Sequence, residues 1–348
     1  MFWTCPDCQG ALEPGGESVT CRACGRAYPL VAELPDFRVD APAWIDFDRD
    51  RDRALHIDRV AREAGLKEAI LDVFRNSRKF DEKKSQYRMR QVLSGLDKVD
   101  AQIDGWLATL MADPVFELGV GPGQLVAAAA RRGRAMHGID VSMEWLVVAK
   151  HWARSFGVEP VLAGGLAERL PVAAGTVGCL ISIDVIEHVG DQRRYAAEIG
   201  RVLRPGGAFA LVTPNRYSLS PEPHVHVWGV GYLPVALQDR YVRLVSGRDY
   251  AYNRLLSTGE IRRLFRREAG IEPQIVFPPI ADEEIALFGG LKTRLARAYN
   301  GVVGSRLAAP VMPFAGAYYR AIGRKPGTGD SARSAPGSDA RSDARSAA

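Results

Sequence analysis

The chain has 348 residues, of which 47% are hydrophobic and 25% charged, so it has ample apolar material for a folded core. The net charge of +5 is too small to indicate nucleic-acid binding by the chain as a whole. No run of about 18 apolar residues occurs, and the start, "MFWTCPDCQG", has neither a basic segment nor a long apolar run. We therefore expect no transmembrane helix, no signal peptide and a cytoplasmic protein.

Four of the five cysteines form two closely spaced pairs, Cys5 with Cys8 and Cys21 with Cys24. Two such turns supply four thiolates to one tetrahedral Zn²⁺. Two disulfides are the alternative, which a reducing compartment disfavours. Together with "GRAYPLVAELPDF", the pairs resemble the zinc ribbons that partner or precede methyltransferases. We expect residues 1–40 to be a zinc ribbon that serves stability or docking and has no part in the chemistry.

Residues 41–113 are rich in charge and have helical spacing, which predicts a helical lid or linker. We expect helices at 54–74, 81–95 and 100–111. In the first, apolar residues from Leu55 to Val73 recur at intervals of mostly three to five positions and form one face.

From residue 114 the pattern changes to short apolar strands that alternate with helices. Strands are predicted at 114–120, 134–142, 178–189 and 208–215, and helices at 123–133, 143–157 and 193–207. This alternation implies an α/β fold whose parallel sheet has helices on both faces. Cys179 lies in the apolar run "VGCLISI" and is expected in the core. We assign 114–325 to this domain, and expect the tail 326–348 to be disordered because it has almost no large apolar side chains.

The stretch "FELGVGPGQL", residues 116–125, connects the first strand to its helix. Its alternating glycines are Gly119, Gly121 and Gly123. A dinucleotide fingerprint needs a glycine at position 124, where Gln stands, and a Walker loop needs Gly-Lys-Ser/Thr, which is missing. Glu117 precedes the loop, and Asp140 ends the next strand, where an acid can accept both hydroxyls of a ribose. Such a loop suits a cationic, phosphate-free nucleoside, and S-adenosylmethionine (SAM) is such a molecule.

Four motifs in order, "FELGVGPGQ", "GIDVS", "LAERLPVAAGTVGCLISIDVIEHV" and "RVLRPGGAFALVTPN", resemble those of class I SAM-dependent methyltransferases over about residues 100–280. The resemblance implies a Rossmann-like, seven-stranded, mostly parallel sheet. It also implies cofactor contacts from Glu117, Gly119, Gly121 and Gly123 at the methionine part, Asp140 at the ribose, and Val141, Met143, Ala167 and Glu168 around the adenine. Leu166 replaces an acid that many relatives use to bind the adenine amino group, so this position is not expected to hydrogen-bond the cofactor.

The resemblance puts the acceptor side at the exits of the later strands. A hydroxyl or protonated amine acceptor needs a base, and the candidates are Asp184, His188 and His224, with His226 ranked lower. Asp184, Glu187 and His188 also match the acid-x-x-Glu-His spacing that binds a divalent metal in ubiquinone-pathway O-methyltransferases and small-RNA 3′-end methyltransferases. Because "EHV" is common in this fold without a metal, we do not expect Mg²⁺ there.

Two acceptor classes compete. The first is a small-molecule or lipid-like acceptor in an apolar pocket that Trp145, Trp228, Tyr232 and the N-terminal helices line or cover. The second is rRNA or tRNA, with the ribbon docking on the RNA. The second is disfavoured because residues 1–40 contain three basic and six acidic residues, and because "TPNR" replaces the signature of base-amino methylation. The acceptor atom, O, N or C, stays open.

Residues 285–325 contain seven basic residues and no acid. Apolar residues recur there at four-residue intervals, at Leu287, Leu291, Leu295, Tyr299 and Val303, and predict a helical insertion at 283–309. It lies between the expected sixth strand, 273–279, and last strand, 317–325. We favour a helix whose apolar face covers the sheet or a second copy, with its bases in water. The alternative is a weak, salt-sensitive contact with the membrane surface.

Overall fold

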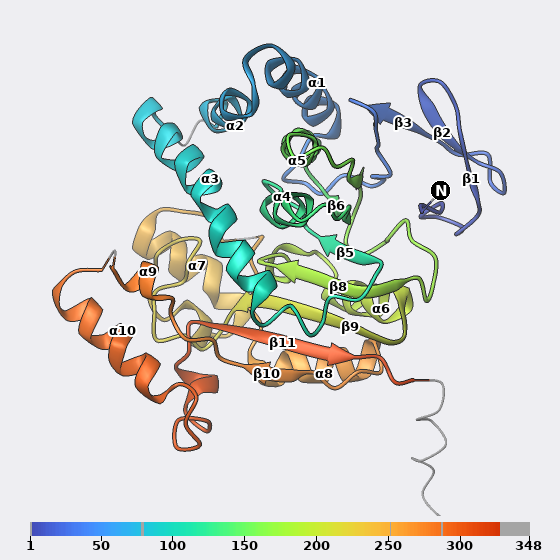
Figure 1. Cartoon of the computed structure of the whole chain (residues 1–348). Helices are drawn as coiled ribbons and strands as arrows, with labels where there is room; N and C mark the ends of the chain where they lie inside the picture. The colour runs from blue at the N-terminus through green and yellow to red at the C-terminus, as the bar shows by residue number, and fades with distance from the viewer. Residues whose placement is uncertain (1, 78–79, 251, 287, 328–348) are drawn as a thin grey trace, which may run out of the picture.

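The computed structural model describes residues 2–77, 80–250, 252–286 and 288–327, without the side chains of residues 283 and 284 (Figure 1). Leu287 and nearly all of the predicted disordered tail, residues 328–348, lie outside this range. The strands are β1 Leu12–Pro14, β2 Ser18–Cys21, β3 Ala27–Val31, β4 Leu34–Pro35, β5 Val115–Leu118, β6 His137–Asp140, β7 Val161–Gly164, β8 Val177–Ile183, β9 Leu203–Pro214, β10 Gln274–Val276 and β11 Tyr318–Arg324. The helices are α1 Phe47–Ala64, α2 Leu66–Arg75, α3 Glu82–Asp104, α4 Gln124–Arg131, α5 Met143–Arg154, α6 Gln192–Val202, α7 Val235–Ser246, α8 Thr258–Glu268, α9 Asp282–Ala286 and α10 Gly290–Val302. Three short 3₁₀ turns are η1 Ile186–His188, η2 Val230–Tyr232 and η3 Met312–Phe314.

The main sheet has seven strands in the order β10-β11-β9-β8-β5-β6-β7. Strands β5 to β9 pair in parallel, and β11 pairs antiparallel with both β9 and β10. The predicted strands at 114–120, 134–142, 178–189, 208–215, 273–279 and 317–325 are all present, with shorter or shifted bounds. β7 is an edge strand that the sequence prediction did not identify.

Alternating side chains of the central strands enter two different cores, as the two-residue period of a strand requires. In β9, Ala208 and Ala210 belong to the core shared with α1 to α5, whereas Phe209 and Leu211 belong to the core shared with α6 and α8. Helices therefore cover both faces of the sheet, as predicted. Cys179 is fully buried in the first of these cores, which confirms its predicted place.

The helices of residues 41–113 differ from the prediction in two places. The predicted helix 54–74 is two helices, because Gly65 adopts a φ of 87° between α1 and α2. Leu55, expected on the apolar face, is exposed, and Ala54 and Ile57 are buried in its place. The predicted helix 100–111 is also wrong: α3 continues through its first half to Asp104 and is followed by turns.

The N-terminal residues form an antiparallel four-stranded sheet, β1 to β4, that packs directly on the main domain. Trp3 and Phe37 share a core with Phe116 of β5. The Phe37 backbone N–H donates to the Gly164 carbonyl at 2.8 Å, so the chain leaving β4 runs beside the edge strand β7. The small sheet thereby covers an edge that would otherwise be open.

The predicted insertion consists of α9 and α10 between β10 and β11. The expectation that its apolar face covers the sheet is wrong, because Leu291 and Leu295 are largely exposed. Within the described residues, no helix is both long and apolar enough to cross a bilayer.

Candidate active site

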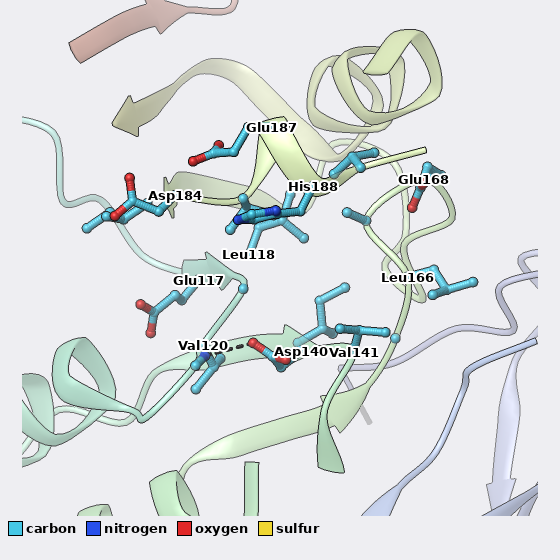
Figure 2. Close-up of a pocket in the computed structure, with 18 of the residues that line it drawn as sticks. Glu117, Leu118, Val120, Asp140, Val141, Leu166, Glu168, Asp184, Glu187 and His188 are labelled. Atoms are coloured by element: carbon cyan, nitrogen blue, oxygen red, sulfur yellow. Dashed lines mark hydrogen bonds between the residues drawn. The ribbon is translucent and has the colours of Figure 1, made fainter. Parts of the chain in front are cut away.

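A cavity of about 1270 Å³ lies at the carboxyl ends of β5, β6 and β8 (Figure 2). This is the edge at which parallel α/β sheets bind ligands. Four other segments complete its wall: residues 40–44 after the small sheet, the C-terminal half of α3, residues 165–169, and residues 252–254. The volume is large enough for a nucleoside-sized ligand together with a second small molecule.

The glycine loop after β5 forms the floor of this cavity, and all three of its glycines have positive φ. At Gly121, with φ of 49°, a Cβ would meet no atom within 4 Å, so the backbone is open towards the cavity. At Gly123, with φ of 85°, a Cβ would lie 2.4 Å from that of Ala149, so only glycine lets α4 begin this close to α5. The loop therefore combines close packing beneath with an open backbone above.

Asp140 is held by backbone donors from both sides at the end of β6. Gly121 N–H donates to Asp140 Oδ2 at 2.7 Å (Figure 2). Ser142 N–H donates to Oδ1 at 2.8 Å. Burial raises the pKa of Asp140 in spite of these two donors. The carboxylate is thus fixed in direction before any ligand is present.

Glu117 brings a second acid to the cavity, and its side chain is 5% exposed. Among the described residues, its Oε2 atom is buried without a hydrogen-bond partner. Burial and the nearby Asp140 carboxylate raise the pKa of Glu117 well above its usual range. A buried carboxylate oxygen without a donor is costly, so this atom matches a ligand that brings a cationic or N–H donor.

A buried ion-pair network ties the exit of the small sheet to the loop after Asp140. Arg38, whose side chain is fully buried, makes two hydrogen bonds to Asp36, at 2.7 and 2.9 Å. It also donates at 2.6 Å to Asp50 of α1 and at 2.6 Å to the Val141 carbonyl. Asp50 in turn accepts from Met143 N–H at 2.8 Å, at the start of α5. The backbone of residues 141–143 is therefore held by a residue more than a hundred positions away.

A family model described as a methyltransferase domain matches residues 116–211. This range contains the glycine loop, Asp140 and the exit of β8. In sequence, residues 116–211 therefore match methyltransferase domains. The strand order, with β11 antiparallel between β9 and β10, is that of the class I methyltransferase fold, as the resemblance implied.

The methyltransferase domain has curated relatives of similar sequence. A probable S-adenosylmethionine-dependent methyltransferase of Mycolicibacterium smegmatis is 41% identical over 110 residues, which are 31% of this chain and 40% of that protein. A ubiquinone biosynthesis O-methyltransferase of Cupriavidus pinatubonensis is 29% identical over 175 residues, 49% of this chain and 64% of that one. The chain thus spans between two fifths and two thirds of the length of these two relatives.

Solved structures similar to the chain include an S-adenosylmethionine-dependent methyltransferase from Mesorhizobium loti, with a TM-score of 0.44 and 16% identity, covering 66% of this chain and 100% of that one. Another is a complex of the Haloferax volcanii Trm112 methyltransferase activator with a putative methyltransferase. Its TM-score is 0.43 at 20% identity, and it covers 68% of this chain and 94% of that one.

The residues expected around an adenine lie on one side of the methyltransferase cavity, with one exception. Val141, Leu166, Ala167 and Glu168 line the cavity. Glu168 Oε1 also accepts from the Gly190 N–H at 3.1 Å and so links two loops of the cavity wall. Met143 does not line the cavity: it is fully buried below it.

Two acids and a histidine from the exit of β8 line the other end of the cavity. Asp184 has a φ of 54°, and burial raises its pKa to about 6. Glu187 is 1% exposed, and burial, reinforced by Asp184, raises its pKa to about 7. Its Oε2 accepts from Thr213 at 3.0 Å, while Oε1 is buried without a partner in the described part of the chain. Burial, and then His224, lower the pKa of His188, which leaves its imidazole neutral at pH 7.

His224 lies behind this group, outside the cavity lining, with its ring 4.8 Å from that of His188. Its Nδ1 is 2.5 Å from Oε1 of the buried Glu222, whose other oxygen accepts from the backbone N–H groups of His224 and Val225. Burial acts to lower the pKa of His224, but the Glu222 carboxylate outweighs it and the pKa is raised. His226 is exposed.

One ligand atom each from Glu187, His188 and His224 lies within 4.8 Å of the others, so the structure adds His224 to the metal spacing noted in the sequence. This proximity does not test the expectation that no Mg²⁺ binds there, which stays a prediction.

The four N-terminal cysteines come together at the end of the small sheet, with their Sγ atoms within 4.8 Å of one another. The distances are 3.8 Å between Cys5 and Cys24 and 3.5 Å between Cys8 and Cys21, so these pairs are not disulfides. Four sulfurs around Zn²⁺ with bonds of about 2.3 Å stand about 3.8 Å apart, so the cluster has the size of a zinc site.

Several cavity residues were missed by the sequence analysis because long-range packing brings them in. Trp44 comes from the segment after the small sheet, Gln102 from α3, and Asn253 from the segment before α8. The aromatic residues predicted to line the pocket do not do so. Trp145 faces a second, shallower hollow, and Trp228 and Tyr232 are exposed elsewhere.

Proposed function

We propose that the protein is a SAM-dependent methyltransferase that acts on a small-molecule or lipid-like acceptor. The observation that carries the proposal is the unpartnered, buried carboxylate of Glu117 beside an oriented Asp140, above a glycine backbone that is open to the cavity. The ammonium group of SAM supplies the missing donor to Glu117, and its ribose hydroxyls supply donors to Asp140.

In this proposal each part of the cavity holds one part of the cofactor. Glu117 and the backbone of Gly119, Gly121 and Gly123 hold the methionine part, Asp140 holds the ribose, and Val141, Ala167 and Glu168 surround the adenine, with Met143 supporting the loop from below. When bound, SAM supplies an electrophilic methyl group on its sulfonium. The chain then has to align the acceptor and exclude water.

The acceptor end supplies the base. His188 is neutral at pH 7, lines the cavity and can accept a proton from an acceptor hydroxyl or amine. Asp184 is the second candidate because its raised pKa brings it closer to neutrality than an ordinary aspartate. Glu222 orients His224, which acts on His188 through its charge and need not touch the acceptor.

The same geometry disfavours an RNA acceptor docked through the ribbon. The three basic side chains of residues 1–40 are all paired with acids: Arg22 with Glu13, Arg26 with Asp7, and Arg38 with Asp36. A surface whose cations are already neutralised gains little from phosphates. We assign the ribbon, residues 1–40, one structural Zn²⁺ held by its four cysteines, and assign 41–113 the role of a lid, since α3 and the segment before α1 line the cavity.

The experiment that tests the acceptor class uses SAM with a labelled methyl group. The protein is incubated with a lipid and metabolite extract, and separately with ribosomal subunits and tRNA, all from cells that lack the gene. We expect label in the organic or small-molecule fraction and none in RNA, with Asp140→Ala as the inactive control. Label in RNA at the same rate would overturn the acceptor assignment but not the methyltransferase activity.

A further inference from the structure

Among the described residues, most of the exposed large apolar side chains belong to the chain segment between β9 and β11. Soluble monomers rarely expose large apolar surfaces without a function. We call the following group the apolar face: Leu219, Trp228, Tyr232, Leu291, Leu295, Val302, Leu307, Val311 and Phe314. It consists of the outer side of α10, the chain that follows α10 as far as Phe314, and an aromatic cluster in contact with Phe314.

Helix α10 turns its polar side to the protein and its apolar side to solvent, which is the opposite of an ordinary surface helix. Its inner side is held by polar contacts: the Asn300 side chain bonds the Ile280 N–H at 2.8 Å and its carbonyl at 2.7 Å, and the Tyr299 hydroxyl donates to the Pro278 carbonyl at 3.0 Å. Its outer side carries Leu291 and Leu295, which are 71% and 61% exposed, and Val302 one helical repeat further on. Most of the surface of these two leucines is therefore open to solvent.

The aromatic cluster is contiguous and ordered by hydrogen bonds. Tyr232 lies 5.5 Å from Tyr217 and 6.3 Å from Trp228, and Tyr217 stacks on Phe314 at 6.1 Å, all between ring centroids. The Tyr232 hydroxyl donates to the Phe314 carbonyl at 2.8 Å, and the Trp228 ring N–H donates to Leu219. Trp228 and Phe314 are nonetheless 59% and 60% exposed. Rings with an apolar body and a polar end suit the boundary between a bilayer and water.

The charge along α10 and the chain that follows it, as far as residue 327, has one sign. The exposed bases Lys292, Arg294, Arg297 and Arg306 flank the leucines of the apolar face, and no acid occurs in the sequence from 285 to 327. A two-fold dimer would place this positive surface against its own copy, which costs energy. An anionic lipid surface instead offers opposite charge together with an apolar interior.

We propose that the apolar face docks the protein on an anionic lipid bilayer, with α10 lying in the plane of the interface and its leucines and the aromatic cluster inserted among the lipid chains. The proposal does not depend on the methyltransferase activity. If both hold, docking brings the cavity to the membrane, where a lipophilic acceptor is concentrated.

Flotation with vesicles tests the proposal without cofactor or acceptor. The full chain is mixed with phosphatidylcholine vesicles with and without about 30 mol% of the anionic lipid phosphatidylglycerol, at low and high salt. Two variants are compared with the natural chain, Leu291→Gln/Leu295→Gln and Arg294→Glu/Arg297→Glu/Arg306→Glu. The first matched control is Leu55→Gln, at an exposed leucine of α1, which lies at the top of Figure 1 whereas α10 lies at the lower left. The second is Lys83→Glu/Arg88→Glu/Arg90→Glu, which makes the same change in charge at exposed residues of α3.

We expect the natural chain and both controls to float with anionic vesicles at low salt, and high salt to weaken the binding. The arginine variant should bind at least about 100-fold more weakly, because each base near an anionic surface contributes about a fivefold gain. The leucine variant should bind at least about 100-fold more weakly, because insertion of each leucine contributes about a tenfold gain. Failure of the natural chain to float at low salt, or equal binding by the leucine variant, would overturn the proposal. A concentration-dependent dimer that the leucine variant abolishes, without flotation, would assign the face to a second copy.

Discussion

The substitution Arg38→Met tests whether the network at the exit of the small sheet supports the cofactor loop. Methionine fills a similar volume but removes both hydrogen bonds to Asp36, the bond to Asp50 and the bond to the Val141 carbonyl. Breaking a buried ion pair by removing one partner costs about 3–5 kcal/mol. Because Asp36 keeps a bond from Arg51 at 2.7 Å, we expect the lower end, about 3 kcal/mol. For a chain of 348 residues, whose unfolding entropy is about 0.7 kcal/mol/K, that loss lowers the melting temperature by roughly 4–5 °C.

The same substitution should weaken binding of S-adenosylhomocysteine about tenfold, because Val141 loses a charge-assisted bond of about 1.5–3 kcal/mol and the loop after Asp140 is then less ordered before binding. Differential scanning calorimetry and isothermal titration measure the two effects. Arg38→Lys keeps the charge without the planar fork and should lie between the natural chain and Arg38→Met. Arg22→Met, in the same ribbon but largely exposed, is the control and should change neither quantity. Unchanged affinity in Arg38→Met, with the expected loss of stability, would show that the network holds the fold and not the cofactor loop.

Three further predictions concern single groups. Burial raises the pKa of Glu187 from 4.5 to about 7, so its contribution to folding stability is fully present below about pH 4.5 and is lost as the pH rises through about 7. Glu187→Gln should therefore raise the free energy of unfolding at pH 8 by up to about 3 kcal/mol and leave it unchanged at pH 4.5. A difference in the free energy of unfolding between the two proteins that stays the same from pH 4.5 to pH 8 would contradict the raised pKa of Glu187. His188→Asn should lower kcat by about 10²–10⁴-fold with little change in S-adenosylhomocysteine affinity, and a loss below tenfold would exclude His188 as the base. The natural chain should contain one zinc ion, lost in Cys5→Ser/Cys24→Ser together with thermal stability; a double variant that keeps its zinc would show that other residues bind it.

Local sequence patterns were enough to predict those elements whose structure depends on residues that are neighbours along the chain. The apolar run at 208–212 predicted a strand of a sheet with helices on both faces, and the glycine loop with Asp140 predicted the cofactor loop. Both predictions depend only on residues that are consecutive in the sequence. The strand β7 escaped because its four residues, "VLAG", end in small side chains and carry little pattern of their own. The predicted helix 54–74 ran through Gly65, whose positive φ separates α1 from α2.

The features that the sequence did not predict depend on packing between residues far apart in the chain. The four-residue period of α10 correctly grouped Leu291 with Leu295, but spacing alone does not tell whether a shared face turns inward or outward. Arg38 reads as a surface charge in the sequence, yet its partner Val141 lies 103 positions later and it is buried. Likewise, the contact of Glu222 with His224 bears on the site only because the fold places His224 beside His188.

The measurement that tests the central claim most directly is isothermal titration of the protein with S-adenosylhomocysteine. We predict one site per chain, and at least about 30-fold weaker binding in Asp140→Ala, because the two ribose hydroxyls lose their charged acceptor. Asp113→Ala, an exposed acid at the opposite end of β5, is the matched control and should bind like the natural chain. Absence of binding by the natural chain, or equal affinity in Asp140→Ala, would contradict the assignment of this cavity to SAM.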